Sequence, residues 1–432
     1  MDTDICAMET SQRSLWRHHD FLSLWFGQSI STVGSRITGE ALPLAAVLTL
    51  HASPLQMGWL QLVAAVPVLL LGMPFGAMVD RHTRRPFLIW ADLLRFALLL
   101  AIPVTALLGH LAMWMLFVIY PVLGLLTQIF NTAYQTYLPG LVGRTNVVEA
   151  NTKLSITSSV AEMIGPALAG TLVQVFTAPI AILLDACSYL VSAMTLLRIR
   201  HSEPKQRQPR QAVFDESPVT SALQLLRDVR DGIQYIASDK TLVALTAGAG
   251  VSALFAGIIF NMDVLYAIDT LHLHAAQFGL TVTFGGIGAL LGAALCQRMV
   301  RAFGYGPALV GAAILSGLFS WFIPLAHGSA WQATLFLMAA QLFGDLFGVV
   351  FEVLESSLRQ VVATDVMLGR VNATLNLLGN VLNPVGAVVG GLIATALSLR
   401  LAMVVGVIGI TLGALCLFIG PIVRRKALPG AL

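Results

Sequence analysis

The amino-acid sequence predicts an all-α membrane protein with twelve transmembrane helices, arranged as two six-helix bundles related by pseudo-symmetry. Three observations predict this fold: an apolar composition, twelve apolar runs long enough to span a membrane, and basic residues concentrated in alternate loops. Hydrophobic residues make up 57% of the 432 residues, charged residues 11%, and the mean hydropathy is +0.81. A soluble chain of this length carries far more charge. We therefore expect the bilayer to be the solvent of this chain.

Short polar or Gly- and Pro-containing segments separate the apolar runs, and crossing a bilayer takes roughly 20 apolar residues. Six runs lie at about 21–50, 55–80, 86–108, 112–138, 152–176 and 179–199. Six more lie at about 242–270, 275–300, 305–326, 331–358, 372–397 and 401–423. We expect an N-terminal bundle over 21–200 and a C-terminal bundle over 241–424, with cytoplasmic tails at 1–20 and 425–432.

Basic residues test this helix count, because cytoplasmic loops of membrane proteins concentrate Lys and Arg. With loops assigned to alternate sides, 22 of the 25 Lys and Arg residues fall on one side. Only Arg400 falls on the other side, and Arg36 and Arg95 lie inside helices. We expect a multi-pass protein of the plasma (inner) membrane with both termini in the cytoplasm.

The segment 201–240 is a long polar stretch between the two sets of runs, and it begins as a charged linker. Its second part places apolar residues at helical spacing opposite charged ones, at Leu223, Leu226, Val229, Ile233 and Ile236. This pattern predicts an amphipathic helix at the cytoplasmic surface. The halves on either side resemble each other weakly, and two parallel six-helix repeats are a known transporter architecture.

The segment joining the second and third runs matches G-x-x-x-D-R-x-x-R-R, the signature loop of the major facilitator superfamily. The matching residues are Gly76, Asp80, Arg81, Arg84 and Arg85, and Thr83 stands where that family usually has glycine. Glycine lets helices approach closely, and an acid at the end of a span can pair with arginines or a helix N-terminus. We expect a cytoplasmic gate here; anchoring by positive charge alone is the alternative.

Three further motifs narrow the resemblance: ADLLR at 91–95, GPALAG at 165–170 and GRVNA at 369–373. From Leu22 to Arg424 the chain resembles the drug:H+ antiporter branch that includes macrolide exporters and the enterobactin exporter. The resemblance implies the major facilitator fold, export by alternating access, and a central cavity lined by helices one, four, seven and ten. The fourth run lacks an arginine that many antiporters of a sister branch carry, which leaves proton coupling open.

Two further sets of residues belong to the expected conformational gate. Asp92 and Arg95 lie about two turns into the third helix, where we expect them to extend the cytoplasmic charge network. Gly165 and Pro166 weaken the fifth helix and let a neighbour pack closely.

Charged side chains inside a bilayer need a partner or a water-filled cavity. Arg36 and Glu40 share one face of the first helix, so mutual neutralisation and a functional role are both open. Glu162 reads as a lone carboxyl near mid-depth. A carboxyl that is neutral when occluded and ionised when wetted suits proton exchange; a neutral acid bonded to a neighbouring helix is the alternative. The proton-coupling candidates are Glu40, Glu162 and Asp185.

Other polar residues of the spans are candidates for a substrate cavity. Asp345, Glu352 and Glu355 descend the tenth helix and would attract a cationic substrate. Pairing with Arg359 or Arg370 is the alternative for the lower two. The substrate-cavity candidates are Gln28, Arg36, Gln128, Asn131, Asp263, Asp345 and Glu352.

No P-loop, nucleophile elbow or His-rich metal spacing occurs, so we expect neither an enzyme nor a cofactor or metal. The leading hypothesis is proton-driven export of a lipophilic small molecule such as a macrolide-like antibiotic. Siderophore export, with Arg36 recruiting an anion, is an alternative, and a non-transporting sensor or assembly protein is another. The expected partners are a small-molecule substrate, protons and the lipid bilayer, with no nucleic acid and a monomeric state.

Overall fold

The computed structural model describes residues 15–80, 82–199 and 218–423, and over these ranges it contains helices and no strand. Six long helices precede the middle segment: α1 (His19–Leu48), α2 (Pro54–Asp80), α3 (Arg84–Leu107), α4 (Met113–Val142), α5 (Val147–Val175) and α6 (Ala178–Arg198). After α7 (Pro218–Ser238) come α8 (Lys240–Leu265), α9 (Ala275–Phe303), α10 (Tyr305–Ser320), the short α11 (Phe322–Leu325), α12 (Ala330–Val362), α13 (Asp365–Ala396) and α14 (Leu399–Cys416).

Eleven helices of the described part are long and apolar enough to cross a membrane. The twelfth long helix of the bundles is α1, which has 30 residues but carries Arg36, Glu40 and several Ser, Thr and Gly residues. It packs against α5 and α6, so it belongs to the N-terminal bundle. The predicted all-α membrane fold is therefore confirmed, and its most polar span was recognisable by length rather than by hydropathy.

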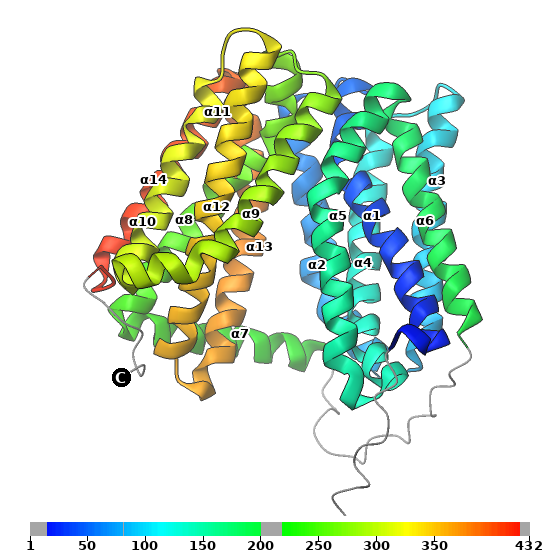
Figure 1. The fold of residues 1–432 in the computed structure, drawn as a ribbon, viewed down its shortest axis with the longest axis horizontal. Coiled ribbons are helices and arrows are strands. Elements are labelled where there is room, and N and C mark those ends of the chain that lie inside the picture. Colours follow the sequence, from blue (N-terminus) through cyan, green and yellow to red (C-terminus); the bar gives the residue numbers. More distant parts are fainter. Residues whose placement is uncertain (1–14, 81, 200–217, 424–432) are drawn as a thin grey trace, which may run out of the picture.

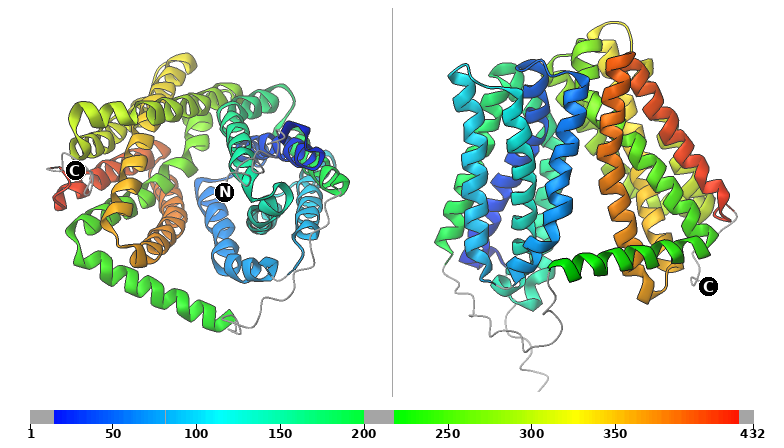
Figure 2. Two further views of the ribbon diagram at one scale, coloured as in Figure 1. Left: turned by 60° about the horizontal axis from the view of Figure 1, so that its bottom comes forward. Right: turned by 180° about the vertical axis from the view of Figure 1, so that it is seen from behind.

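The helices form two bundles that stand side by side, with α1–α6 in one and α8–α14 in the other (Figure 1). The bundles meet where α5 packs on α9 and α2 packs on α13. The amphipathic helix α7 lies across one end of the molecule, roughly perpendicular to the other helices (Figure 2). We call this end the α7 end and the opposite one the far end.

Helix α7 is fastened to the C-terminal bundle. Arg370, in the first turns of α13, contacts Asp228 at 3.0 Å and Asp231 at 3.2 Å. The backbone N–H of Thr364 donates to the Tyr235 hydroxyl at 3.1 Å. These contacts hold α7 at the level where α12 ends and α13 begins.

The bundles are in tight contact toward the far end. A Cβ placed on Gly279 of α9 would lie 2.2 Å from the Pro166 carbonyl oxygen, and one on Gly170 would lie 2.3 Å from that of Ala275. On the opposite side, a Cβ on Gly58 of α2 would lie 2.5 Å from the Ala387 carbonyl oxygen. Backbones this close require glycine, so the two halves are sealed at this end.

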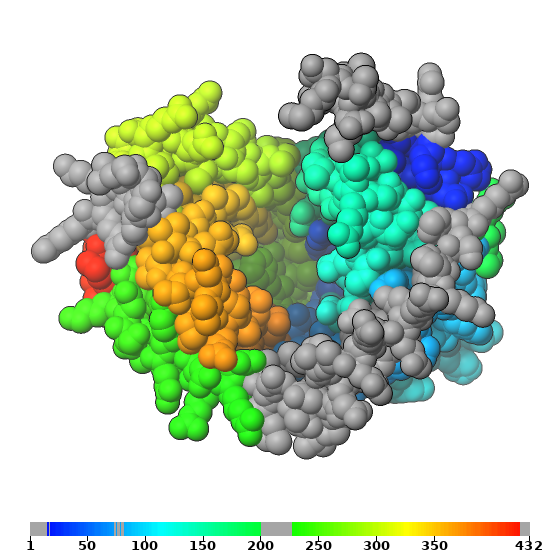
Figure 3. All heavy atoms as spheres, turned by 90° about the horizontal axis from the view of Figure 1, so that it is seen from below, coloured from blue at the N-terminus to red at the C-terminus, as the bar shows by residue number. Residues whose placement is uncertain are grey.

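Toward the α7 end the bundles separate. Seen from below, the space-filling view shows a hollow between them that reaches deep into the molecule (Figure 3). The structure is therefore open at the α7 end and closed at the far end, which is one of the two states that alternating access needs.

Candidate functional site

An ion pair joins two spanning helices of the N-terminal bundle, α1 and α5. Arg36 Nη1 of α1 lies 3.1 Å from Glu162 Oε1 of α5, with side-chain exposures of 43% and 59%. Gly165 makes room for it, because a Cβ there would lie 2.6 Å from Arg36 Cβ. A half-exposed pair at this depth needs water rather than lipid tails around it. It therefore faces the hollow.

This pair corrects the expectation for Glu162. Glu162 is neither lone nor occluded, because its carboxylate is exposed and bound to Arg36. Of the two alternatives left open for Arg36 and Glu40, mutual pairing is not the ion pair that forms, because the carboxylate bound to Arg36 belongs to a neighbouring helix. Sequence spacing could indicate only a partner on the same helix. The ion pair with α5 depends on the close approach of α1 and α5 at Gly165.

Three further acids continue from this pair into the other bundle. Glu40 lies within electrostatic range of Arg36, and Asp263 of α8 lies within range of both Glu40 and Asp345. Asp263 is only 9% exposed. We call Glu162, Arg36, Glu40, Asp263 and Asp345 the cross-bundle charge set. With one base and four acids, it favours positive charge, whether protons or a cationic group of a substrate.

Asp345 occupies a position that α9 makes possible. A Cβ on Gly285 of α9 would lie 2.2 Å from Asp345 Oδ2, so this glycine accommodates the carboxylate. Within the described ranges, no group of three or more His, Cys, Asp or Glu side chains is arranged to hold a metal ion.

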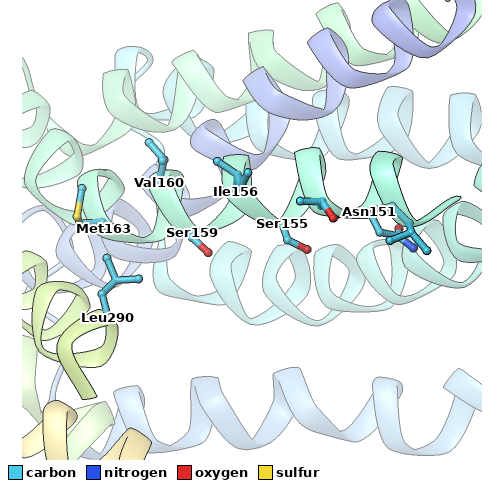
Figure 4. Close-up of a pocket in the computed structure, with 9 residues that line it drawn as sticks. Asn151, Ser155, Ile156, Ser159, Val160, Met163 and Leu290 are labelled. Atoms are coloured by element: carbon cyan, nitrogen blue, oxygen red, sulfur yellow. Dashed lines mark hydrogen bonds between the residues drawn. The ribbon is translucent and has the colours of Figure 1, made fainter. Parts of the chain in front are cut away.

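A groove of about 660 Å³ runs along α5. Figure 4 shows its two characters: the side chains of Ser155 and Ser159 point to one side, and those of Ile156 and Val160 point to the other. Met163 of α5 and Leu290 of α9 lie at one end of the groove. Met163 lines the groove and follows Glu162 in the sequence, whereas Glu162 and Arg36 are not among its lining residues.

The other expected cavity residues differ in their surroundings. Gln128 and Asn131 are exposed on α4, and Glu352 is exposed on α12. Gln28 instead donates through Nε2 to Ser192 Oγ of α6 at 3.1 Å. Gln28 is therefore bonded to α6 within the N-terminal bundle, and its role in a substrate cavity stays a prediction.

The lower acids of α12 are partly neutralised within their own helix. Glu355 Oε1 accepts from Arg359 Nη1 at 3.2 Å, which is the pairing that the sequence left open. Glu352 lines a second cavity of about 240 Å³ beside this pair. Arg370, the other candidate partner, binds α7 instead.

Asp92 and Arg95 do not extend a charge network toward the signature loop. They pair with each other at 2.5 Å, with side-chain exposures of 0% and 4%. Asp185 of α6 is also fully buried. All three lie in the interior of the N-terminal bundle, because α3 turns this face toward α6 and not toward the loop.

Two arginines of the signature loop are described. Arg85 donates from Nε to the Leu196 carbonyl at 3.1 Å and from Nη2 to that of Leu197 at 2.9 Å, so it caps the end of α6. Arg84 begins α3. Gly76 and Asp80 belong to α2, but their side chains are outside the description, and Arg81 lies outside the described residues. Gating by this loop stays a prediction.

Sequence reasoning missed the hydrogen bonds that join the bundles. The backbone N–H of Ala167 donates to Thr283 Oγ1 at 3.1 Å, and that of Ala276 donates to Gln174 Oε1 at 3.0 Å. The nearest signal was the small-residue run GGIGALLGAA on α9, which indicates a close helix contact, but Gly288 and Gly292 of this run pack on α12 of the same bundle. The residues that form the hydrogen bonds between the bundles lie outside this run.

Comparison with known proteins gives the following similarities. The family described as transmembrane secretion effector matches residues 10–428. The uncharacterised MFS-type transporter YfiS of Bacillus subtilis is 25% identical over 91% of both chains. Macrolide efflux protein A of Streptococcus pyogenes is 22% identical over 57% of this chain and 58% of its own. The enterobactin exporter EntS of Citrobacter koseri is 24% identical over 95% and 94%.

Solved structures share the fold. A bacterial homologue of the iron transporter ferroportin, in an inward-facing state, gives a TM-score of 0.69 at 18% identity, covering 94% of this chain and 99% of its own. A bacterial homologue of the lysosomal transporter Spinster gives 0.65 at 13% identity, covering 94% and 97%.

Proposed function

The chain belongs to the transmembrane secretion effector family of major facilitator transporters, and we propose that it exports a lipophilic small molecule in exchange for protons. The family and the similar solved structures are transporters, and no catalytic family is indicated. The proposal therefore starts from an efflux-type, multi-pass membrane transporter. The substrate class and the coupling ion are what we propose.

The Arg36–Glu162 pair carries the proposal. An ionised Glu162 occupies Arg36, whereas a protonated Glu162 releases it and removes one negative charge from the hollow. Each proton bound or lost therefore changes the charge that a substrate meets. Mutually exclusive occupation by a proton and by a positively charged or polar substrate group is what exchange requires. Glu40, on the same helix, is the second proton carrier that we propose.

The α5 groove supports a lipophilic substrate with a few polar groups. Ile156 and Val160 offer apolar surface, and the hydroxyls of Ser155 and Ser159 offer hydrogen bonds. The acid excess of the cross-bundle charge set favours neutral or cationic molecules. Anion export would require displacing Glu162 from Arg36, which makes it the weaker candidate.

The proposed cycle uses the two ends of the molecule in turn. The substrate enters from the cytoplasm through the open α7 end, the halves close there, and the glycine contacts at the far end part. Proton binding at Glu162 from the far side then competes with the substrate and completes the exchange.

A vesicle assay tests the proposal. Inverted membrane vesicles containing the protein are acidified inside and given a lipophilic cationic dye, a neutral macrolide or a catechol siderophore. We expect accumulation of the cationic or neutral probe, and loss of accumulation when a protonophore collapses the pH gradient. Glu162→Gln should abolish the gradient-driven step but retain exchange of labelled for unlabelled probe.

Glu149→Gln is the matched control, since Glu149 lies on the same helix and pairs with Lys153 near the α7 end. It should behave as the natural protein. Accumulation that survives the protonophore, or a Glu162→Gln variant with full gradient-driven transport, would refute proton exchange at this carboxyl. Accumulation of the siderophore alone would refute the substrate class.

A further inference from the structure

Three charged side chains are sealed inside the N-terminal bundle. Asp92 and Arg95 of α3 and Asp185 of α6 are exposed by 0%, 3% and 0%. The guanidinium of Arg95 lies between two rings, 4.3 Å from the centroid of Phe130 and 4.3 Å from that of Tyr189. This aromatic enclosure keeps water from the cluster.

In each of the two carboxyl groups of the cluster, only one oxygen is hydrogen-bonded. Asp92 Oδ1 accepts from Arg95 Nη2 at 2.5 Å, and Arg95 Nε donates to the Ala91 carbonyl at 3.3 Å. Asp185 Oδ1 accepts from the Ser188 hydroxyl at 2.9 Å. The second oxygens, Asp92 Oδ2 and Asp185 Oδ2, are both buried without a hydrogen-bond partner among the described residues.

Helix α1 closes the cluster on its open side. A Cβ on Gly34 would lie 2.4 Å from Asp185 Oδ1, so this glycine fits directly over the carboxyl. Thr38 of α1, whose hydroxyl is also buried without a partner, lies beside Asp185. Ser35 shares a hydrogen bond of 2.9 Å with the Tyr189 hydroxyl. Helix α1 therefore faces Asp185 with neutral groups only.

The charges of the cluster do not balance if every group is ionised. Asp92 and Asp185 would contribute two negative charges and Arg95 one positive charge. The other groups that face Asp185 are neutral: the hydroxyls of Thr38 and Ser188 and the Tyr189 phenol. Arg36, the nearest further base on α1, binds Glu162 in the hollow. An unpaired charge in such a site is strongly disfavoured.

We propose that the Asp92–Arg95–Asp185 cluster binds one proton, and that Asp185 carries it. Asp92 is the ionised partner because it contacts Arg95 directly, whereas Asp185 touches only neutral donors. A proton on Asp185 leaves one acid and one base, so the cluster becomes neutral. This site is separate from Glu162 and does not rest on proton exchange there. It explains how α1, which carries Arg36 and Glu40, can pack so closely over a carboxyl.

Counting charges by substitution tests the proposal on the purified full-length protein in lipid nanodiscs. The infrared carbonyl band of protonated carboxylic acids is compared between the natural protein and three variants at neutral pH. We expect Asp185→Asn to lose one carboxylic-acid equivalent. Asp92→Asn should lose the same equivalent, because Asp185 then ionises as the counterion of Arg95. Asp269→Asn, at an exposed acid, is the control and should leave the band unchanged.

Thermal unfolding gives an independent readout. Each single substitution leaves Arg95 with one anion, so both variants should unfold near the natural temperature. The double variant Asp92→Asn/Asp185→Asn leaves Arg95 buried without an anion and should lose folded yield or unfold far earlier than the two single shifts predict. A band unchanged by Asp185→Asn, or additive shifts in the double variant, would overturn the proposal.

Discussion

Arg36 of α1 and Glu162 of α5 form an ion pair of 3.1 Å in which both side chains remain about half exposed, although both helices lie in the bundle. A pair that is exposed in a soluble protein adds little to stability. Here the same exposure means that water or substrate reaches both charges. The pair is thus poised to respond to what enters the hollow, and its energetic role in folding is small.

Arg36→Gln should change the charge preference of transport without unfolding the protein. Because the pair is half exposed, we expect a stability loss of about 1 kcal/mol or less. With the sole base of the cross-bundle charge set removed, export of cationic probes should persist or rise, and any export of anionic probes should fall about tenfold or more. Competition between labelled cationic and anionic probes in inverted vesicles measures this preference.

The control for Arg36→Gln is Arg227→Gln, at an exposed arginine of α7. It removes the same charge far from the hollow and should leave the preference unchanged. Equal loss of both probe classes in Arg36→Gln would contradict a charge-selecting role.

The sequence predicted the architecture well because lipid imposes a simple rule on it. Runs of apolar residues had to be helices, and their ends follow Gly, Pro and charged punctuation within a few residues. The largest differences are at two ends: the eleventh run was expected from 372, but α13 begins at Asp365, and the last run was expected to 423, but α14 ends at Cys416. The first turns of α13 lie before the apolar run and contain Arg370, which binds α7.

The partners of charged residues were harder to predict. Helical spacing on α1 indicated Glu40 as a possible partner of Arg36. The ion pair of Arg36 is instead with Glu162, because Gly165 lets α1 approach α5. Asp92 and Arg95 were assigned to the wrong environment, since only the packing of α3 against α6 decides which face is buried. Contacts between helices distant in sequence depend on backbone approach, which a single sequence does not encode locally.

Arg370→Gln should release α7 from the C-terminal bundle. Arg370 contacts Asp228 and Asp231, and all three side chains are between 40% and 45% exposed. We therefore expect a small loss of stability, about 1 kcal/mol or less. The amides of α7 should nevertheless exchange with deuterium faster, because two of the contacts that hold this surface helix are gone. Hydrogen-exchange mass spectrometry of α7 peptides measures the change.

Arg230→Gln is the control for this release. Arg230 is exposed on α7 and forms no ion pair among the described residues. Its substitution should leave the exchange of α7 unchanged. Unaltered exchange in Arg370→Gln would show that apolar packing alone holds the helix.

The α7 end should face the cytoplasm. Ile233 of α7 is 54% exposed, and His110 is exposed in the α3–α4 loop at the far end. In a variant without the four natural cysteines, we expect an impermeant thiol reagent to label His110→Cys in right-side-out vesicles. Ile233→Cys should react only in inverted vesicles, because positively charged loops stay on the cytoplasmic side. The reverse pattern would invert the topology and the proposed direction of transport.

Gly279→Leu should shift the protein toward the state that is open at the far end. The carbonyl oxygen of Pro166 would lie 2.2 Å from the new Cβ, so α5 and α9 must separate there. Overpacking costs about 1–3 kcal/mol, which is enough to change a two-state equilibrium roughly 5- to 150-fold. A cysteine at Ser155, in the groove near the α7 end, should then react more slowly with a hydrophilic thiol reagent.

Gly311→Leu is the control, because no atom lies within 4 Å of a Cβ at that glycine of α10. Equal reactivity at Ser155→Cys in both backgrounds would mean that the glycine contact seals the far end without setting which end is open.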